Sequence, residues 1–314
     1  MNDRSCPEMS VVLITPDRYD TVRKTISYLR EQTVKHRLEI VIVAPSADRL
    51  NLEEPELKEF FTFSVVEVGE VTSIGAANCA GVQRANAPIV ALGEDHAYPD
   101  PDWAEILIEA HQESWAAVGA EVRNGNPDSI TGWADFLLNY GPWIEPAAAE
   151  EVDHLPGHNS SYKREILLEY GPELDIMLEA ESVLHWDLKS KGYRLYLEPR
   201  AKFNHLNFEL LSSWIPAQFY SGRLFAGVRA RGWCFLRRML YTAAAPIIPV
   251  VRGRRIVGQL RRSRCPRRLS VLPLLAFGLC VSAIGEMAGY ALGEGNAKQK
   301  LTPLHFNGGS PTGV

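Results

Sequence analysis

Ala87-Pro-Ile-Val-Ala-Leu-Gly-Glu-Asp-His-Ala-Tyr-Pro-Asp-Pro-Asp-Trp103 is the stretch that decides the fold. Its first part, Ala87–Leu92, is a short apolar segment between turn-forming residues, which is typical of a buried strand in an α/β sheet. Acidic and imidazole side chains follow at once, and Asp102-Trp103 can open a helix. Open α/β sheets bind ligands at the carboxyl ends of their strands, so this stretch predicts a site.

Three metal-capable side chains stand together at this strand end: Glu94, Asp95 and His96. Carboxylate oxygens with one imidazole suit Mg²⁺ or Mn²⁺ better than a structural zinc ion. The alternative is an acidic turn that caps the following helix, and the stretch by itself leaves both interpretations open.

Strand-like and helix-like segments alternate before this stretch. Apolar runs at Ser10–Ile14, Leu38–Val43 and Phe63–Val68 predict three strands, and helical spacing over Asp20–Gln32 predicts a helix. The alternation predicts an α/β fold with a mostly parallel sheet and helices on both faces. Small residues in Gly75–Gly81 let the backbone come close to a ligand or to another element.

Two common nucleotide-binding signatures are missing from the sequence. A G-x-x-x-x-G-K-[ST] phosphate loop is absent, and so is a G-x-G-x-x-G fingerprint after the first strand. These absences remove most of the support for an ATPase or a classical dinucleotide-binding enzyme.

Further elements are predicted later in the chain. Thr131–Tyr140 is aromatic and predicts a helix, and Leu178–Tyr193 predicts one long helix with Gly192 as its C-cap. Leu195–Leu197 predicts a short strand.

The charges divide the chain into two different surfaces. Residues 1–209 hold 18 Lys and Arg against 36 Asp and Glu, a net charge of −18. Leu210–Gly285 holds 13 arginines with no acidic residue and no lysine, and eight of these arginines lie in Arg252–Arg268. Such a region is a candidate for anionic membrane or nucleic acid. Because the arginines lie among apolar segments rather than among stacking aromatics, we expect no nucleic acid partner.

An apolar segment, Leu269–Leu292, follows the arginines and carries one charge, Glu286. A spanning helix needs about 20 apolar residues, but the proline and glycines here weaken this one. The segment could span a membrane, lie in its interface, or form part of a soluble helical pair that covers the catalytic domain. The arginines favour the cytoplasmic side. We expect a catalytic domain over 1–228, a membrane-associated helical region over 229–293 and a flexible tail over 294–314.

Cysteine usage and the N-terminus bear on the compartment. The five cysteines include no C-x-x-C pair, so they predict neither a zinc site nor a disulfide framework, and a reducing compartment is the default. Met1–Glu8 lacks the apolar run of a signal peptide, which favours a cytoplasmic location for the first domain.

The order of motifs over about Met9–Trp233 resembles family 2 glycosyltransferases, which have the GT-A fold. Five segments carry the resemblance: Thr15-Pro16 after the first strand, Gly75-Ala-Ala-Asn-Cys-Ala-Gly81, Glu94-Asp-His96 followed by Pro99 and Trp103, Gly157-His-Asn-Ser-Ser-Tyr-Lys-Arg164, and Ala180-Glu181 with Leu188, Gly192-Tyr193 and the later His205.

The chain departs from the family pattern at several positions. The family's D-x-D is Glu94-x-His96 here, its E-D pair is Ala180-Glu181, and Pro45-Ser46 replaces the acidic pair after the second strand. The Q-x-x-R-W motif of processive synthases is missing, which favours a single addition over polymer synthesis.

The resemblance implies roles for particular residues. It implies that a nucleotide-diphosphate sugar binds at Thr15, Pro16, Arg18, Gly75, Asn78, Glu94 and Asp95. It implies that Mn²⁺ or Mg²⁺ is held by Glu94, Asp95, His96 and His205. Glu181 becomes the candidate base, with His185 one helical turn later, and a surface Glu–His pair is the alternative. The acceptor would meet Gly157, His158, Asn159 and Trp186.

The resemblance thus implies an inverting, hexosyltransferase-like enzyme at the inner face of the cell membrane, with a lipid-linked or small-molecule acceptor. Two alternatives remain. One is a catalytically inactive GT-A relative that acts as a membrane scaffold. The other is a nucleotidyltransferase on a related fold, for which Thr15-Pro-Asp-Arg18 is a poor version of the required loop.

Overall fold

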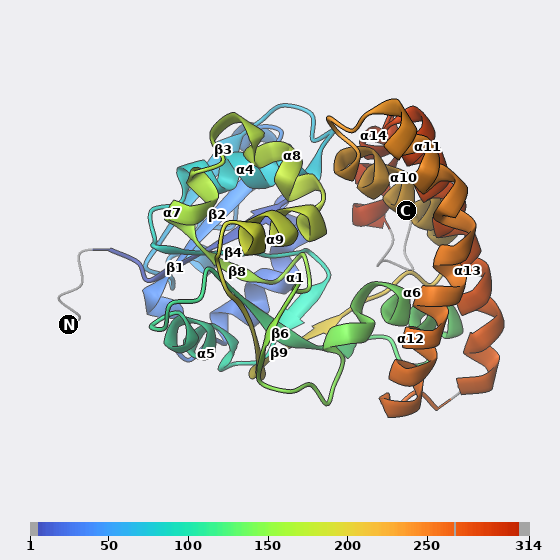
Figure 1. Ribbon diagram of the computed structural model, residues 1–314. Coiled ribbons are helices and arrows are strands. Elements are labelled where there is room, and N and C mark those ends of the chain that lie inside the picture. Colours follow the sequence, from blue (N-terminus) through green and yellow to red (C-terminus); the bar gives the residue numbers. More distant parts are fainter. Residues whose placement is uncertain (1–5, 267, 308–314) are drawn as a thin grey trace. The chain divides into compact units, whose positions relative to one another are not determined.

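The computed structural model of the protein describes residues 6–266 and 268–307, so Met1–Ser5 and Arg267 of the sequence predictions lie outside the described residues. Within the described residues, strands form one sheet in the order β3-β2-β1-β4-β8-β6-β9-β5, with β7 paired to β9 (Figure 1). The strands are β1 (Met9–Ile14), β2 (Leu38–Ala44), β3 (Thr62–Glu67), β4 (Ile89–Leu92), β5 (Ala97–Pro99), β6 (Ala117–Asn124), β7 (Glu150–Val152), β8 (Ser161–Lys163) and β9 (Leu195–His205).

The centre of the sheet is parallel and buried. β1 pairs in parallel with β2 on one side and with β4 on the other, and Val12 lies opposite both Val41 and Leu92. All residues of β1, β2 and β4 are buried, as expected for a strand that is covered on both faces. The predicted α/β fold with a mostly parallel sheet is confirmed.

An antiparallel strand interrupts this pattern. β8 inserts between β4 and β6 and runs antiparallel to both, with Tyr162 opposite Val90 and Ala117. Because β8 runs back along β4, the residues that precede β8 lie beside the carboxyl end of β4. The sheet therefore brings Gly157–Ser160 to Glu94.

The helices of the described residues are α1 (Tyr19–Arg30), α2 (Ala47–Leu50), α3 (Glu54–Leu57), α4 (Ile74–Arg84), α5 (Trp103–Ala110), α6 (Ile130–Tyr140), α7 (Arg164–Leu168), α8 (Leu174–Glu179), α9 (Glu181–Ser190), α10 (Leu211–Arg229), α11 (Phe235–Ala244), α12 (Ile248–Arg262), α13 (Arg268–Leu292) and α14 (Ala297–Asn307). Short 3-10 turns include η2 (Gly141–Trp143) and η4 (Ala245–Ile247). α4 packs on β1 and β2, and α8 packs on α4.

The chain forms two compact units. The first consists of the residues up to Arg123 together with Ala147–Asn204, and it holds most of the sheet. The second consists of Asn124–Pro146 together with the residues from His205 onward, and it is helical. The boundary between the two units is not the one expected at residue 228, because α6 and all of α10 belong to the helical unit.

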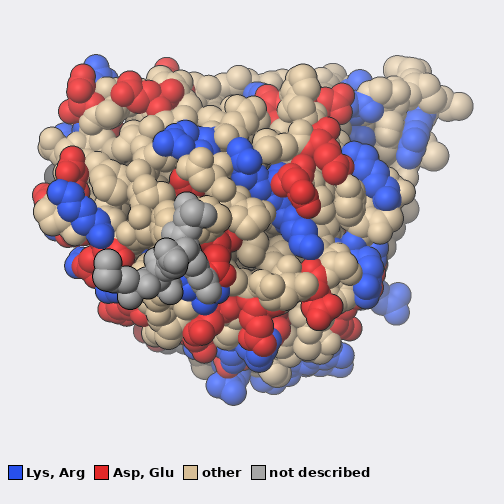
Figure 2. All heavy atoms as spheres, turned by 90° about the vertical axis from the view of Figure 1, so that its left-hand side faces the viewer, with Lys and Arg blue, Asp and Glu red and all other residues tan. Residues whose placement is uncertain are grey.

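On the face of the first unit seen in Figure 2, acidic and basic side chains are interspersed.

The second unit is built around α10 and α13. These two helices pack along each other, α6, α11 and α12 pack on α13, and α14 packs on α10 (Figure 1). Buried Asp135 on α6 joins α6 to α10, because its carboxylate accepts hydrogen bonds from Trp214 Nε1 at 3.0 Å and Gln218 Nε2 at 3.1 Å.

Three local predictions were wrong in their extent. The single helix expected over Leu178–Tyr193 is two helices, because Ala180 leaves the helical region with φ −142° and ψ 73°. The short strand at Leu195–Leu197 continues to His205, so Pro199 lies within β9, a strand that also pairs with β7. The tail expected to be flexible contains α14, and residues 308–314 lie outside the described residues.

Among the described residues, α13 is the helix that is long and apolar enough to cross a membrane. Its most apolar window has a mean hydropathy of 1.9, and 44% of that window is buried within the protein. Glycines and alanines on its α10 side permit this burial, since a Cβ at Gly285 or Gly289 would overlap the α10 backbone.

The packing of α4 on the sheet predicts a stability difference between two glycines. Gly81→Ala places a Cβ on the stiff side chain of Val12 in β1, whereas Gly258→Ala in α12 meets nothing within 4 Å. We expect Gly81→Ala to destabilise the protein by about 1–3 kcal/mol and Gly258→Ala to leave it unchanged or raise its stability by up to about 1 kcal/mol. Thermal denaturation of the two variants checks this, and equal midpoints would contradict the packing of α4.

Candidate active site

The site begins where the chain leaves β4. Gly93 N donates to Val12 O at 2.8 Å, which extends the pairing with β1 by one residue. The Glu94 carbonyl then accepts a hydrogen bond from Thr25 Oγ1 of α1 at 2.9 Å. These two bonds fix the backbone of Glu94 at the carboxyl edge of the parallel strands, where the sequence predicted a ligand site.

His96 stands between two carboxylates. Its Nδ1 lies 2.6 Å from Asp95 Oδ1, and its Nε2 lies 3.8 Å from Glu94 Oε1. Because a carboxylate only accepts hydrogen bonds, Nδ1 carries a proton, and in the neutral ring the lone pair is then on Nε2. The structure thus places Asp95 behind the imidazole, in the position that supports a metal-binding histidine.

Glu94 Oε1 and His96 Nε2 are close enough for one divalent ion to contact both. Two donors on one Mg²⁺ ion, each at about 2.1 Å, lie no more than about 4.2 Å apart, and these two atoms are 3.8 Å apart. A carboxylate oxygen and a neutral imidazole nitrogen are also a suitable donor pair for Mn²⁺ or Mg²⁺. The residues present therefore fit the metal that the resemblance implies.

Asn159 connects the loop before β8 to Glu94. Its backbone N donates to Leu92 O at 2.6 Å, and its side-chain Nδ2 donates to Glu94 Oε2 at 2.8 Å. Its φ of 63° lies in the left-handed region, which asparagine tolerates better than most residues. Asn159 therefore orients the Glu94 carboxylate with one oxygen held and the other toward His96.

His158 lies between Glu94 and Glu181. Its Nδ1 is 3.4 Å from Glu181 Oε1, and its Nε2 is 3.9 Å from Glu94 Oε1. Burial lowers the pKa of this imidazole, but the Glu181 and Glu94 carboxylates outweigh burial and raise the pKa above its usual value. His158 thus links the candidate base to the predicted metal-binding carboxylate.

Glu181 is the first residue of α9, directly after the break at Ala180. Its carboxylate lies against the backbone of Gly157, so that a Cβ on Gly157 would stand 2.8 Å from Glu181 Cδ. A side chain at position 157 would therefore make the Glu181 carboxylate shift. The helix break was missed in the sequence, although it determines where this carboxylate lies.

Glu179, the carboxylate two residues before Glu181, caps the start of α4. Its Oε2 accepts hydrogen bonds from Ser73 Oγ at 2.5 Å and from Gly75 N at 2.8 Å at the start of α4. A Cβ on Gly75 would also collide with α8. The close approach that the small residues permit here is therefore to another element. Ser73 directly before the helical run was the sequence signal for this cap, since its Oγ accepts from Ala76 N.

His185 is buried and does not form the surface pair considered as an alternative. Leu155 N donates to its Nδ1 at 3.3 Å, and its Nε2 lies 2.8 Å from Tyr162 OH. Burial lowers its pKa to about 3, so it is neutral. Because Leu155 and Tyr162 flank the loop that carries His158 and Asn159, His185 ties this loop to α9.

The remaining predicted residues fall into three places. Thr15 is buried after β1, and its Oγ1 donates to Arg18 O at 2.7 Å, while Pro16 is half-buried and Arg18 is exposed at the start of α1. Asn78 is buried within α4. Trp186 is 40% exposed on α9. Their roles in binding donor and acceptor stay predictions.

His205, the fourth predicted metal ligand, belongs to the second unit. It is buried at the end of β9, its ring lies 4.5 Å from the Tyr140 ring, and its Nδ1 is 3.0 Å from Asn207 Oδ1. The amide oxygen can only accept, so Nδ1 carries a proton, and in the neutral ring the lone pair on Nε2 could bind a metal. Its role as a ligand stays a prediction.

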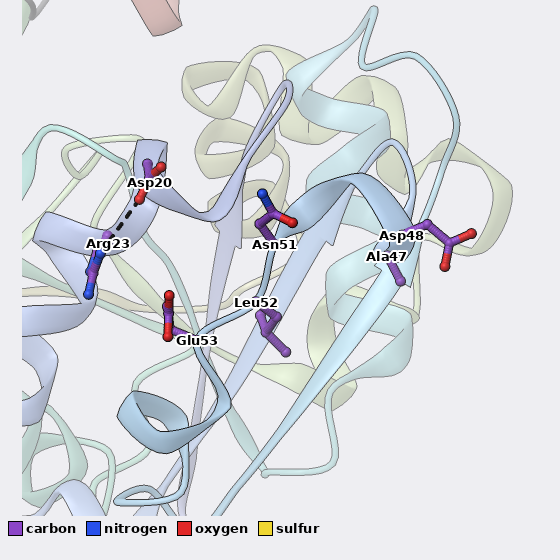
Figure 3. Close-up of a pocket in the computed structure, with 7 residues that line it drawn as sticks. All are labelled: Asp20, Arg23, Ala47, Asp48, Asn51, Leu52 and Glu53. Atoms are coloured by element: carbon purple, nitrogen blue, oxygen red, sulfur yellow. Dashed lines mark ion pairs between the residues drawn. The ribbon is translucent and has the colours of Figure 1, made fainter.

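A separate polar hollow of about 600 Å³ lies beside α1 and is lined by Asp20, Arg23, Ala47, Asp48, Asn51, Leu52 and Glu53 (Figure 3). Asp20 and Arg23 come from the outer side of α1, opposite Thr25, whose hydroxyl bonds to Glu94. The hollow therefore shares no residue with the carboxylate and histidine cluster.

Comparison with known proteins identifies the family. A sequence model described as "Glycosyl transferase family 2" matches residues 10–171, about half of the chain. The chain belongs to glycosyl transferase family 2. The proposed resemblance is confirmed, and the protein is a nucleotide-sugar glycosyltransferase of an inverting family.

Two relatives show how far the similarity extends. A glucosyl-dolichyl phosphate glucuronosyltransferase of Haloferax volcanii is 22% identical over 222 residues, which cover 64% of this chain and 70% of that protein. The structure of GalNAc-T7 with UDP, GalNAc and Mn²⁺ has a TM-score of 0.51 and 14% identity, and the match covers 78% of this chain and 51% of that one. This structural likeness shows the fold.

The contact between Gly157 and Glu181 predicts a large effect of a small substitution in this glycosyltransferase. Gly157→Ala must displace the Glu181 carboxylate, and we expect the rate of sugar transfer to fall on the order of a hundredfold, since small displacements in a catalytic site cost about this much. Initial rates of nucleoside diphosphate release check this, with Gly258→Ala as the matched control. A fully active Gly157→Ala variant would show that the position of the Glu181 carboxylate is not critical.

Proposed function

We propose that this glycosyltransferase adds one sugar to an acceptor hydroxyl from a nucleotide-diphosphate sugar, with Glu181 as the catalytic base. The observation that carries the proposal is the arrangement around His158. Glu181 lies on one edge of this imidazole and Glu94 on the other, within one compact unit. A base and a carboxylate for the donor side are thereby held close together, as an inverting transfer requires.

The transfer is a single displacement that needs only the donor, the acceptor and the base. The acceptor oxygen attacks the anomeric carbon from the side opposite the diphosphate, and the bond from that carbon to the diphosphate oxygen breaks with its electron pair going to the diphosphate. Glu181 takes the proton of the acceptor hydroxyl. Attack opposite the leaving group gives inversion at the anomeric carbon.

Glu94 and His96 would hold a divalent cation, Mn²⁺ or Mg²⁺, with Asp95 orienting the imidazole. The bound ion would neutralise charge on the leaving diphosphate. Asn159 keeps the Glu94 carboxylate oriented. His158 can donate a hydrogen bond toward a sugar or acceptor hydroxyl while it stays close to Glu181.

For the acceptor we propose a lipid-linked sugar, with a small-molecule acceptor as the alternative. The support is the name of the Haloferax volcanii relative, which acts on a glucosyl-dolichyl phosphate, and the arginine-rich apolar region of this chain. We place the reaction at the cytoplasmic face of the membrane, where basic segments concentrate. We propose UDP as the first nucleotide to test, since the GalNAc-T7 structure contains it.

Substitution of Glu181 separates the catalytic proposal from the scaffold alternative. Glu181→Gln keeps the size of the side chain and removes the base, so we expect transfer to fall by about a thousandfold, within the usual range for general bases. Donor binding, measured as a rise in the melting temperature with the nucleoside diphosphate, should persist. Unchanged transfer would remove Glu181 from the mechanism, and a scaffold would show no transfer in either form.

The donor and the metal can be tested together. We expect one of UDP, GDP, dTDP and CDP to raise the melting temperature in the presence of Mn²⁺, because a ligand that binds only the native state stabilises it. His96→Ala should lower the affinity for Mn²⁺, measured from the Mn²⁺ concentration that gives half of the shift, at least about tenfold. Asp95→Asn should lower it by about tenfold, as the loss of a supporting residue does. Exposed His36→Ala is the matched control. No shift with any nucleotide in the folded protein would contradict the donor class.

A further inference from the structure

α11 has its apolar side turned outward. Phe235 and Leu236 are 76% and 78% exposed, and Leu240 on the same side of the helix is 65% exposed. Arg238 points inward instead, with its Nε donating to Tyr290 O at 2.9 Å. A helix on the surface of a protein that meets only water would have the opposite arrangement.

Aromatic packing holds α11 in this orientation. Tyr241 lies on the inner side, and its ring is 4.7 Å from the Trp233 ring and 5.4 Å from the Tyr290 ring of α13. These contacts and the Arg238 bond come from the same helix face. The outward apolar face is therefore set by the fold of the second unit.

The next helix adds further apolar and basic side chains. Through η4 the chain continues into α12, and both helices pack along α13 (Figure 1). Exposed apolar residues of this segment include Ile247, Val250 and Val251, and exposed arginines of α12 include Arg254, Arg261 and Arg262. In the described part of the chain no ion pair involves these three arginines. Leu210–Gly285 contains no acidic residue, so α11 and α12 themselves contribute only positive charge to this surface.

α13 is held within the protein by its contacts with α10. A Cβ on Gly285 would overlap Phe219 O, and one on Gly289 would overlap Arg223 O, so the two backbones are in direct contact. Glu286, next to Gly285 in α13, is buried, and its Oε1 lies 3.3 Å from Arg252 Nη1 of α12. A helix that crosses a bilayer alone would have to give up this carboxylate–guanidinium pair and expose Glu286 to hydrocarbon.

We propose that α11, η4 and α12 form a surface that docks on anionic phospholipid, with the apolar residues in the headgroup boundary and the arginines on lipid phosphates, while α13 stays packed in the protein. This inference rests on the proposed function at a membrane and specifies the partner and the elements that meet it. Apolar residues bind at the membrane interface by burying apolar surface, and flanking arginines add electrostatic attraction to anionic lipid.

Vesicle binding of the full-length protein tests the surface without any sugar transfer. We expect the protein to sediment with phosphatidylcholine vesicles that contain phosphatidylglycerol, and to be released by salt. Leu236→Gln with Leu240→Gln should weaken binding at least about tenfold. Arg254→Gln, Arg261→Gln and Arg262→Gln together should weaken it on the order of a hundredfold, at roughly 1 kcal/mol per arginine. The matched control is Phe61→Gln with Val68→Gln, two exposed apolar residues of the first unit.

The role of α13 is tested on membranes from cells that make the protein. An interfacial protein is released by an alkaline carbonate wash, whereas a spanning helix is retained, and retention would overturn the proposal for α13. Equal vesicle binding by all variants, or a dimer in solution that the Leu236 and Leu240 substitutions abolish, would overturn the docking surface. The Mn²⁺-dependent nucleotide shift is measured on the same samples, so failure of the donor site and failure of membrane docking are distinguished.

Discussion

The site depends on the hydrogen bonds between the end of β4 and the residues just before β8. Asn159 N donates to Leu92 O, and Leu92 N donates to Ser160 O at 3.2 Å. The bonds extend the antiparallel pairing of β8 by one step beyond the strand. Since Glu94 follows Leu92 by two residues and His158 precedes Asn159 by one, a shift in this register would separate the two sides of the site.

This constraint also explains the use of asparagine and glycine in one short loop. Gly157 leaves room for the Glu181 carboxylate, and Asn159 adopts a positive φ while its amide reaches Glu94. His185 and Tyr162 hold the two ends of the loop and are both neutral, so they add no charge to the cluster. The Glu94 carboxylate is therefore oriented by a neutral amide.

Much of the fold could be predicted from the sequence, because the parallel strands are continuous apolar runs. The grouping of Glu94, His158 and Glu181 in the candidate site followed from the order of the family motifs. Elements that depend on tertiary contacts could not be predicted. The break at Ala180 has no glycine or proline to mark it, and it follows from Glu179 binding the start of α4 while Glu181 reaches Gly157. The pattern around His185 did not reveal its burial, because Leu155 and Tyr162 are distant in sequence. The contact between Asp95 and His96 was not predicted either, because a metal ligand and a supporting carboxylate look alike in a motif.

The helical unit is assembled from two separate parts of the chain, Asn124–Pro146 and the segment from His205 onward. On the ribosome α6 emerges well before α13, since Tyr140 precedes Arg268 by 128 residues. Until α13 arrives, Leu138 has no Gly278 to pack against. The sheet likewise waits for β9, which ends at His205. The first unit can therefore complete its sheet as soon as β9 has been made, whereas the face of α6 that packs on α13 stays uncovered until α13 follows.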